Sequence, residues 1–219
     1  MQRSWVDILR GDFAAATDRA AQARELLDSW PRHSWLQYAR LDDHLGSILR
    51  AEALADPATA HAKFEQAADL KLPAALAVDS VRYAIGDADA RMRWATRVSA
   101  RVLAGAFAVA WEWGNTALVS ELIEYHSARG TFSVPASPQT ADWADAATAA
   151  VPVDDADEYA LVASGPGTVD GAMLTKLGAL PPLRMHPNAE PVLKYYRDLA
   201  QLRYGRTVTS AEPEWSTWP

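Results

Sequence analysis

Apolar residues in the first 130 positions recur at steps of three and four, which is the spacing of one face of an α-helix. Short turns with glycine, proline or aspartate separate the stretches that follow this spacing. The clearest example lies between positions 12 and 28, with the apolar set Phe13, Ala16, Ala20, Ala23 and Leu27. The pattern predicts successive helices at residues 4–10, 12–28, 35–55, 57–70, 71–86, 89–113 and 116–129.

Residues typical of helix ends support these boundaries. Ser34 is a suitable N-cap for the third helix, and Asp56-Pro57 pairs an N-cap acid with proline at the first helical position. Pro73 predicts a further start, because proline fits the first turn of a helix and disrupts its interior. We therefore expect one helix to end near residue 70 and the next to begin at Lys71.

Helices of this length joined by short turns predict antiparallel helix pairs. Gly11-Asp12, Gly86-Asp87 and Gly114-Asn115 resemble the turn of tetratricopeptide (TPR) repeats, although their spacing is irregular. In an ordinary bundle the same pairs would be a helix C-cap followed by an N-cap. A TPR-like solenoid and a helical bundle both stay open, and both are all-α.

After residue 130 the pattern becomes less regular. Residues 131–187 combine prolines, a short alanine-rich segment and an acidic run, and they predict an irregular connector with a short helix. Residues 188–219 predict a final helix, Glu190 to Tyr204, and then a tail with Trp215 and Trp218. We thus expect three parts: a helical domain at 1–130, a connector at 131–187, and a C-terminal helix and tail at 188–219.

The composition agrees with an all-α fold and excludes several functions. Alanine, the best helix former, is the commonest residue, and nine tryptophans against four phenylalanines predict large wedges between closely packed helices. The chain has no cysteine, which excludes thiol catalysis and iron–sulfur or zinc–thiolate sites. A net charge of −7 argues against general nucleic-acid binding. With no apolar run of membrane-spanning or signal-peptide length, we expect a cytoplasmic protein that binds no membrane.

Known catalytic and cofactor motifs fail on spacing. Asp42-Asp43 resembles the metal-binding acids of terpene cyclases but lacks their further acid, so we interpret the pair as solvated or as partners of Arg40 or Arg50. The histidines are too far apart in sequence for a zinc pair on one helix. The glycine-rich segment 164–168 lacks the ending of a phosphate-binding loop. We expect no cofactor, no metal and no catalytic residue.

Two stretches resemble a known family. They are residues 106–124 (AFAVAWEWGNTALVSELIE), and residues 177–185 (LGALPPLRM) with the later segment from Tyr195 to Gly205 and the tryptophan tail. Both resemble the helical region and connector that precede the caspase-like domain of actinobacterial CHAT-TPR proteins. The resemblance implies a helical scaffold or sensor that works beside a protease-like domain. The caspase-like domain is absent from this chain, and without cysteine the chain cannot act as a cysteine protease.

Two functions of different class follow. The first is a non-enzymatic scaffold or regulatory module that binds a protein, either a protease-like chain or a second copy. Its contact residues would be Trp215, Trp218, Tyr195 and Tyr204. The second is a small-molecule enzyme or ligand-binding protein with an apolar, tryptophan-lined pocket around Trp94 and Trp111. In a helix Trp111 and Trp113 point to different sides, so we expect both to be core wedges.

Overall fold

A computed structural model describes residues 2–85, 87–128, 183–184, 190–208 and 215–216. In these ranges the chain is helical apart from one two-stranded parallel pair, β1 with β2, and the predicted all-α class is confirmed. The elements in order are α1 (Gln2–Leu9), α2 (Phe13–Ser29), α3 (Trp35–Ala55), α4 (Ala60–Ser80), the 3₁₀ turn η1 (Val81–Tyr83), α5 (Ala88–Trp94), the π-helical segment η2 (Ala95–Ser99), α6 (Ala100–Glu112), α7 (Thr116–Ala128), β1 (Leu183–Arg184), α10 (Val192–Tyr204) and β2 (Trp215–Ser216).

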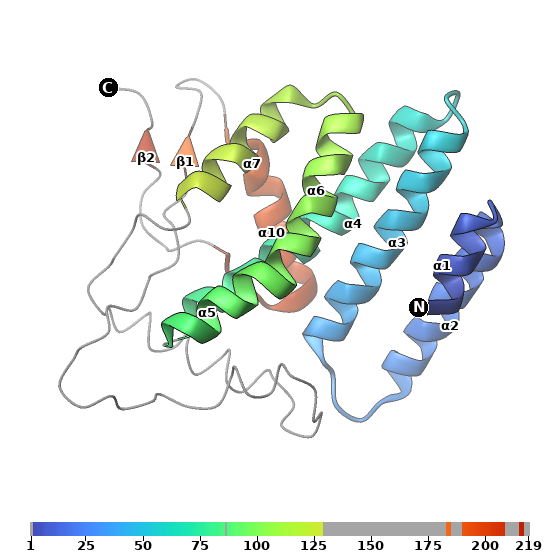
Figure 1. Ribbon diagram of the computed structural model, residues 1–219, viewed down its shortest axis with the longest axis horizontal. Coiled ribbons are helices and arrows are strands. Elements are labelled where there is room, and N and C mark those ends of the chain that lie inside the picture. Colours follow the sequence, from blue (N-terminus) through green and yellow to red (C-terminus); the bar gives the residue numbers. More distant parts are fainter. Residues whose placement is uncertain (1, 86, 129–182, 185–189, 209–214, 217–219) are drawn as a thin grey trace.

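The antiparallel pair of α3 and α4 lies at the centre of the molecule (Figure 1). α1 and α2 pack at one end of this pair, while α6 crosses α4 on the other side and leads into α7 (Figure 1). α4 is buried along most of its length. Many of its buried residues are small, which lets the neighbouring helices approach closely: Ala67, Ala68, Ala74, Ala75 and Ala77. Abundant alanine therefore acts in this fold as the sequence predicts.

α10 belongs to the same packed body as the N-terminal helices. It contacts α4, α7 and α3 although more than sixty residues separate it from α7. Leu193, Tyr196 and Ala200 join the main hydrophobic core from this helix. At its start, the Glu121 carboxylate of α7 accepts hydrogen bonds from the backbone N–H groups of Val192 and Leu193, at 2.8 and 2.7 Å. A side chain from α7 thus caps the N-terminus of α10.

The predicted helix boundary at residues 71–73 is wrong, because α4 runs unbroken from Ala60 to Ser80 with Pro73 inside it. Proline has no N–H, so the carbonyl of Asp69, four residues earlier, loses its usual helical partner. Nη1 of Arg203 in α10 donates to that carbonyl oxygen at 2.6 Å. The buried tertiary contacts of α4 outweigh the local preference of proline for a helix start.

The glycine–aspartate and glycine–asparagine pairs mark helix ends. Gly11 and Gly114 have φ of 76° and 75°, a left-handed conformation that favours glycine, where α1 and α6 end. Asp12 then accepts from the N–H of Ala15, and Asn115 accepts from that of Leu118, each at 3.1 Å. A C-cap followed by an N-cap accounts for both pairs, and a repeat architecture stays a prediction.

A buried lysine connects three helices of the central layer. Nζ of Lys71 in α4 lies 2.5 Å from Oδ1 and 2.9 Å from the carbonyl oxygen of Asp43, and 2.9 Å from Oγ of Ser47. Gly46 of α3 and Gly105 of α6 leave the space that its side chain occupies. All three ammonium hydrogens thus have partners, which makes the burial of this charge tolerable.

The interpretation of Trp111 as a core wedge is wrong. Trp111 is 75% exposed, and only Trp113 packs against the core, with its ring centroid 5.9 Å from that of His61. His44 is 3% exposed and is a core residue. Within the described residues, no helix is both long and apolar enough to cross a membrane, and no cluster of three acids or histidines could hold a metal ion.

Candidate ligand pocket

A pocket of about 700 Å³ lies among α2, α3, α4 and α10. This size falls in the range of roughly 300–1,000 Å³ that is typical of small-molecule sites. Its lining combines aromatic rings, two guanidinium groups, an imidazole and a carboxylate: Arg24, His33, Trp35, Tyr38, Asp42, Leu70, Arg203 and Tyr204. Most of the pocket surface is apolar and includes the Trp35 ring, and the pocket also carries charged groups that the sequence does not predict there.

The predicted pair Trp94 and Trp111 does not line this pocket. Trp94 is 3% exposed and donates from Nε1 to the carbonyl oxygen of Val78 at 3.0 Å, so it belongs to the core. Trp111 points outward. The ring that supplies the tryptophan wall is Trp35, from the first turn of α3.

Three pocket residues come from one face of α3. Trp35, Tyr38 and Asp42 lie three and four residues apart, so they stand above one another on the helix surface. The sequence contains this spacing, and it also contains the buried apolar stripe of the same helix, which includes Leu41 and Ile48. The α3 face alone makes one wall, and the site is complete only when α2 and α10 pack beside it.

Asp42 connects the three helices around the pocket. It is 4% exposed, its Oδ1 pairs with the guanidinium of Arg24, and its Oδ2 accepts from the Tyr204 hydroxyl at 2.7 Å. The interpretation of Asp42 as solvated or paired with Arg50 is therefore wrong. Arg50 instead pairs with Glu112, with 2.6 Å between Nε and Oε2.

Tyr204 stays protonated across the physiological range. Burial raises the pKa of its hydroxyl well above the ordinary value, and the neighbouring Asp42 carboxylate raises it further. The hydroxyl consequently acts as a fixed donor to Asp42. With both carboxylate oxygens engaged, Asp42 is a positioning group that holds Arg24 and α10 in place.

The outer side of the pocket is formed by Tyr38 and His33. The Tyr38 hydroxyl donates to Oδ1 of Asp28 at 2.6 Å, and this hydrogen bond is the main reason that the pKa of Tyr38 is raised. Nδ1 of His33 lies 3.3 Å from the same hydroxyl oxygen. Because the single tyrosine hydrogen is directed to Asp28, His33 is the donor in this contact. The guanidinium of Arg24 lies 5.8 Å from the centre of the Tyr38 ring.

Trp35 separates the pocket from a buried polar cluster. The guanidinium carbon of Arg206 lies 5.0 Å from the centre of the Trp35 ring, in the range of a cation–π contact. Burial lowers the pKa of Arg206 to about 10. Nη2 of Arg206 lies 3.4 Å from Oγ of Ser80 at the end of α4.

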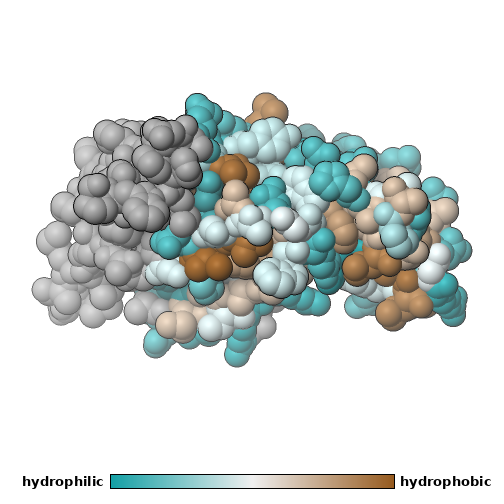
Figure 2. Space-filling view, turned by 90° about the horizontal axis from the view of Figure 1, so that it is seen from above, coloured by the Kyte–Doolittle hydropathy of each residue, from teal (hydrophilic) through white to brown (hydrophobic). Residues whose placement is uncertain are grey.

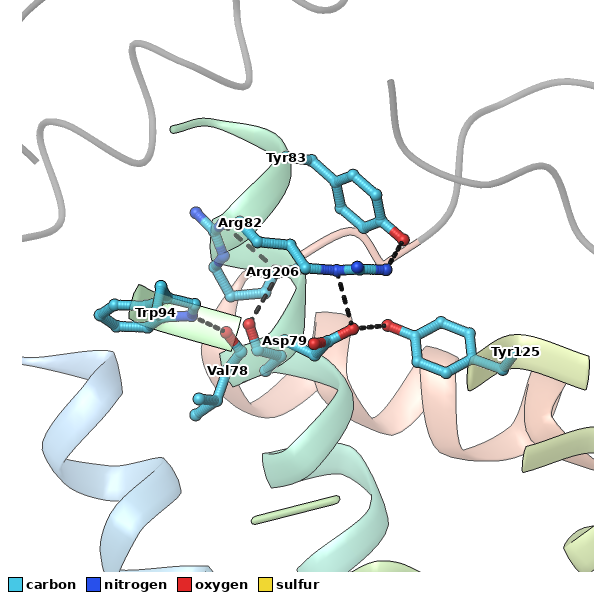
Figure 3. Close-up of polar contacts among 9 residues, drawn as sticks. Val78, Asp79, Arg82, Tyr83, Trp94, Tyr125 and Arg206 are labelled. Atoms are coloured by element: carbon cyan, nitrogen blue, oxygen red, sulfur yellow. Dashed lines mark hydrogen bonds and ion pairs between the residues drawn. The ribbon is translucent and has the colours of Figure 1, made fainter. Parts of the chain in front are cut away.

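Figure 3 shows this buried cluster, which joins α4, η1, α5, α7 and the segment after α10. Oδ2 of Asp79 accepts from the Tyr125 hydroxyl at 2.7 Å and lies 3.2 Å from Nε of Arg82. Nη2 of Arg82 donates to the Tyr83 hydroxyl at 2.6 Å. Burial, and then the Asp79 charge, raise the pKa of Tyr125 well above its ordinary value. These contacts hold the C-terminal end of α4 against α5, α7 and the segment after α10.

A serine–histidine pair also lies in the core. Nε2 of His44 is 2.8 Å from Oγ of Ser4, a separation that a hydrolase would need. The Ser4 hydroxyl, however, donates to the carbonyl oxygen of Ala16 at 3.0 Å, and Nδ1 of His44 is buried with no partner among the described residues. Ser4 and His44 are only 1% and 3% exposed, so a substrate cannot reach them in this structure. Their hydrogen bond instead holds α1 against α3.

The residues predicted to bind a partner separate in the structure. Tyr204 is buried and lines the pocket, whereas Tyr195 is 53% exposed, with its hydroxyl 3.4 Å from Oδ2 of Asp69. Trp215 pairs with Leu183 through the backbone of β2, and Trp218 lies outside the described residues. Arg24 and Arg203 were missed, since no local sequence signal brings them to α3.

No protein-family model matches the chain, and neither does any curated protein or solved structure. The resemblance to CHAT-TPR helical regions accordingly stays a prediction.

Proposed function

We propose that this chain is a helical ligand-binding module and that the pocket holds a small molecule. The observation that carries the proposal is the convergence of side chains from α2, α3, α4 and α10 around about 700 Å³. A pocket of this size is typical of small-molecule sites. The charged groups of the lining are held by ion pairs and hydrogen bonds, so the site is formed in advance of binding.

Binding in this pocket can be tested by filling it. We would screen a fragment library by saturation-transfer NMR against the wild type and against Leu70→Trp, which places a large ring in the pocket lining. Leu54→Trp is the matched control, because Leu54 is 57% exposed and lies outside the lining. We expect fragments to bind the wild type and Leu54→Trp but not Leu70→Trp. Equal binding by all three proteins, or none to the wild type, contradicts the proposal.

Protein binding is the second candidate, and the polarity of α1 favours it. α1 turns Ser4 and Asp7 inward while Trp5, Val6 and Leu9 are 44%, 44% and 85% exposed. Figure 2 shows hydrophobic residues gathered at the end of the molecule where α1 and α2 lie. Exposed apolar residues grouped in this way are typical of interaction surfaces. A scaffold or regulatory role beside a protease-like chain, or self-association, would use this surface and the predicted tail residues.

This second candidate has its own experiment. Sedimentation equilibrium of the full chain would be compared with that of the double variant Trp5→Ser/Leu9→Ser. We expect the wild type to associate and the double variant to be monomeric, with Leu54→Ser on α3 as the control that loses an exposed leucine elsewhere. A wild type that stays monomeric at high concentration contradicts self-association. The tail is tested in the same way with Trp215→Ala/Trp218→Ala.

A further inference from the structure

We infer that the ligand of this pocket is an aromatic molecule with an acidic group, a carboxylate or a phosphate. The inference rests on the proposed ligand-binding function and names the chemical class that the lining selects. It depends on which groups of the pocket are already engaged and which still have capacity for a ligand.

The pocket has more hydrogen-bond donors than acceptors. Both oxygens of Asp42 already accept, one from Arg24 and one from Tyr204. Arg203 uses Nη1 for the carbonyl of Asp69 and also hydrogen-bonds to the Tyr204 hydroxyl, and its remaining N–H groups have capacity for a ligand. The same holds for the N–H groups of Arg24 beyond the one on Asp42. A ligand rich in acceptors matches this lining.

The charge of the lining also favours an anion. Two guanidinium groups, Arg24 and Arg203, face a single carboxylate, Asp42. Two further acids that lie close by are engaged, and Glu65 lies near one of them, Asp69. Asp28 accepts from Tyr38, and Asp69 lies beside the Tyr195 hydroxyl and Arg203. Burial raises the pKa of Asp69, while the hydrogen bond from Tyr195 and the charge of Arg203 lower it. Guanidinium groups bind carboxylates and phosphates in a planar, two-pronged geometry.

The aromatic part of the ligand follows from the rings of the lining. Trp35, Tyr38 and Tyr204 contribute to the pocket, and Leu70 adds an aliphatic surface. The Trp35 indole N–H is buried without a partner among the described residues, so this side chain offers ring surface rather than a donor. Flat apolar surfaces of this kind favour stacking with a planar ring. An acidic group at the two arginines then fixes the orientation of that ring.

The test compares probes that share one ring system and differ in charge. Dissociation constants of the full chain would be measured by NMR titration for naphthoate, naphthyl phosphate, neutral naphthalenemethanol and cationic naphthylmethylamine. We expect at least one anion to bind about tenfold more tightly than the neutral probe, as a hydrogen-bonded charge pair would give. The two anions distinguish a carboxylate ligand from a phosphate ligand.

Matched variants locate the charge that is responsible. Arg203→Gln removes the guanidinium, and Lys194→Gln removes one positive charge from the exposed side of the same helix. We expect Arg203→Gln to weaken the anion about tenfold and the neutral probe less than about twofold, with Lys194→Gln changing neither. Arg203 also holds α10 against α4, so Arg203→Gln changes the packing of this helix as well as the charge of the pocket. Arg203→Lys, which keeps the positive charge, and the salt dependence of anion binding to the wild type therefore provide a second measurement.

The outcomes separate this inference from the function on which it rests. If the neutral or cationic probe binds as tightly as the anions, or if Arg203→Gln weakens all probes equally, the ligand class is wrong and the pocket function stands. If no probe binds the wild type at millimolar concentration and the fragment library also fails, both are overturned.

Discussion

Arg203 donates a hydrogen bond to the carbonyl oxygen of Asp69, across 134 positions of sequence, at 2.6 Å. That oxygen lacks its helical partner because Pro73 stands four residues later inside α4. The unpaired carbonyl that Pro73 leaves in α4 is thus the point where α10 attaches. This contact also holds Arg203 in the pocket lining.

Pro73→Ala tests this relationship. Alanine restores an N–H that can return to the Asp69 carbonyl and compete with Arg203. We expect hydrogen exchange to become slower in α4 around residues 69–77 and faster in α10. Hydrogen–deuterium exchange with mass spectrometry measures both helices in one experiment. Unchanged exchange in α10 would show that Arg203 does not depend on the proline.

Tyr204→Phe removes the donor to Asp42 and leaves one buried oxygen of that carboxylate without its partner. We expect a loss of about 1–2 kcal/mol in the free energy of unfolding, measured with urea. Tyr195→Phe is the control, because its hydroxyl is exposed and 3.4 Å from Asp69, and it should change stability by less than about 0.5 kcal/mol. Equal effects of the two variants would contradict the structural role of Tyr204.

Gly46→Ala should destabilise the protein although alanine is the better helix former by about 1 kcal/mol. A Cβ atom at Gly46 would overlap Cγ of Lys71 and lie 3.1 Å from the carbonyl oxygen of Ala67. We expect a net loss of about 1–3 kcal/mol in urea unfolding. Gly105→Ala would place a Cβ atom 3.0 Å from Cε and Nζ of Lys71, a milder overlap than at Gly46, and should cost less. The reverse order would show that α3 and α4 can separate to admit the methyl group.

His44 makes stability depend on pH. Burial lowers its pKa, so the unfolded chain takes up the proton more readily than the folded one. Its contribution is fully present above the unfolded value of about 6.5 and is lost as the pH falls below it. We expect the free energy of unfolding of the wild type, measured with urea, to fall between about pH 7.5 and about pH 5. The free energy of unfolding of His44→Gln should fall less over the same interval. An identical pH profile for the two proteins would exclude His44 as the cause.

Much of the helical pattern could be predicted from the sequence. The range 35–55 matches α3 in full, and the long helix predicted at 89–113 is the continuous run of α5, η2 and α6. Both segments have clear apolar periodicity, and Asp87 caps the second by accepting from the N–H of Ala90, so local preferences and packing agree. Pro73 was misinterpreted because its local signal opposes the tertiary contacts of α4, which no local pattern reveals.

The candidate site was predicted only in part. The sequence predicts Tyr204 as a partner contact, and Tyr204 lies in the pocket, while the predicted pocket residues Trp94 and Trp111 lie elsewhere. Aromatic residues can be found in a sequence, but whether a ring faces the core, a pocket or solvent depends on the neighbouring helices. Trp111 and Trp113 lie on different faces of their helix, and only the packing of α6 decides which of them reaches the core.

The sequence by itself determined the all-α class, the positions of most helices and the absence of thiol chemistry. These properties depend on residue type and on spacing within a single helix. Only the tertiary structure decided that Arg24, Asp42 and Tyr204 meet, since they lie on three helices and up to 180 positions apart. Their meeting depends on how α10 packs against α3 and α4. The spacing of residues within a single helix does not reveal which distant segments pack together.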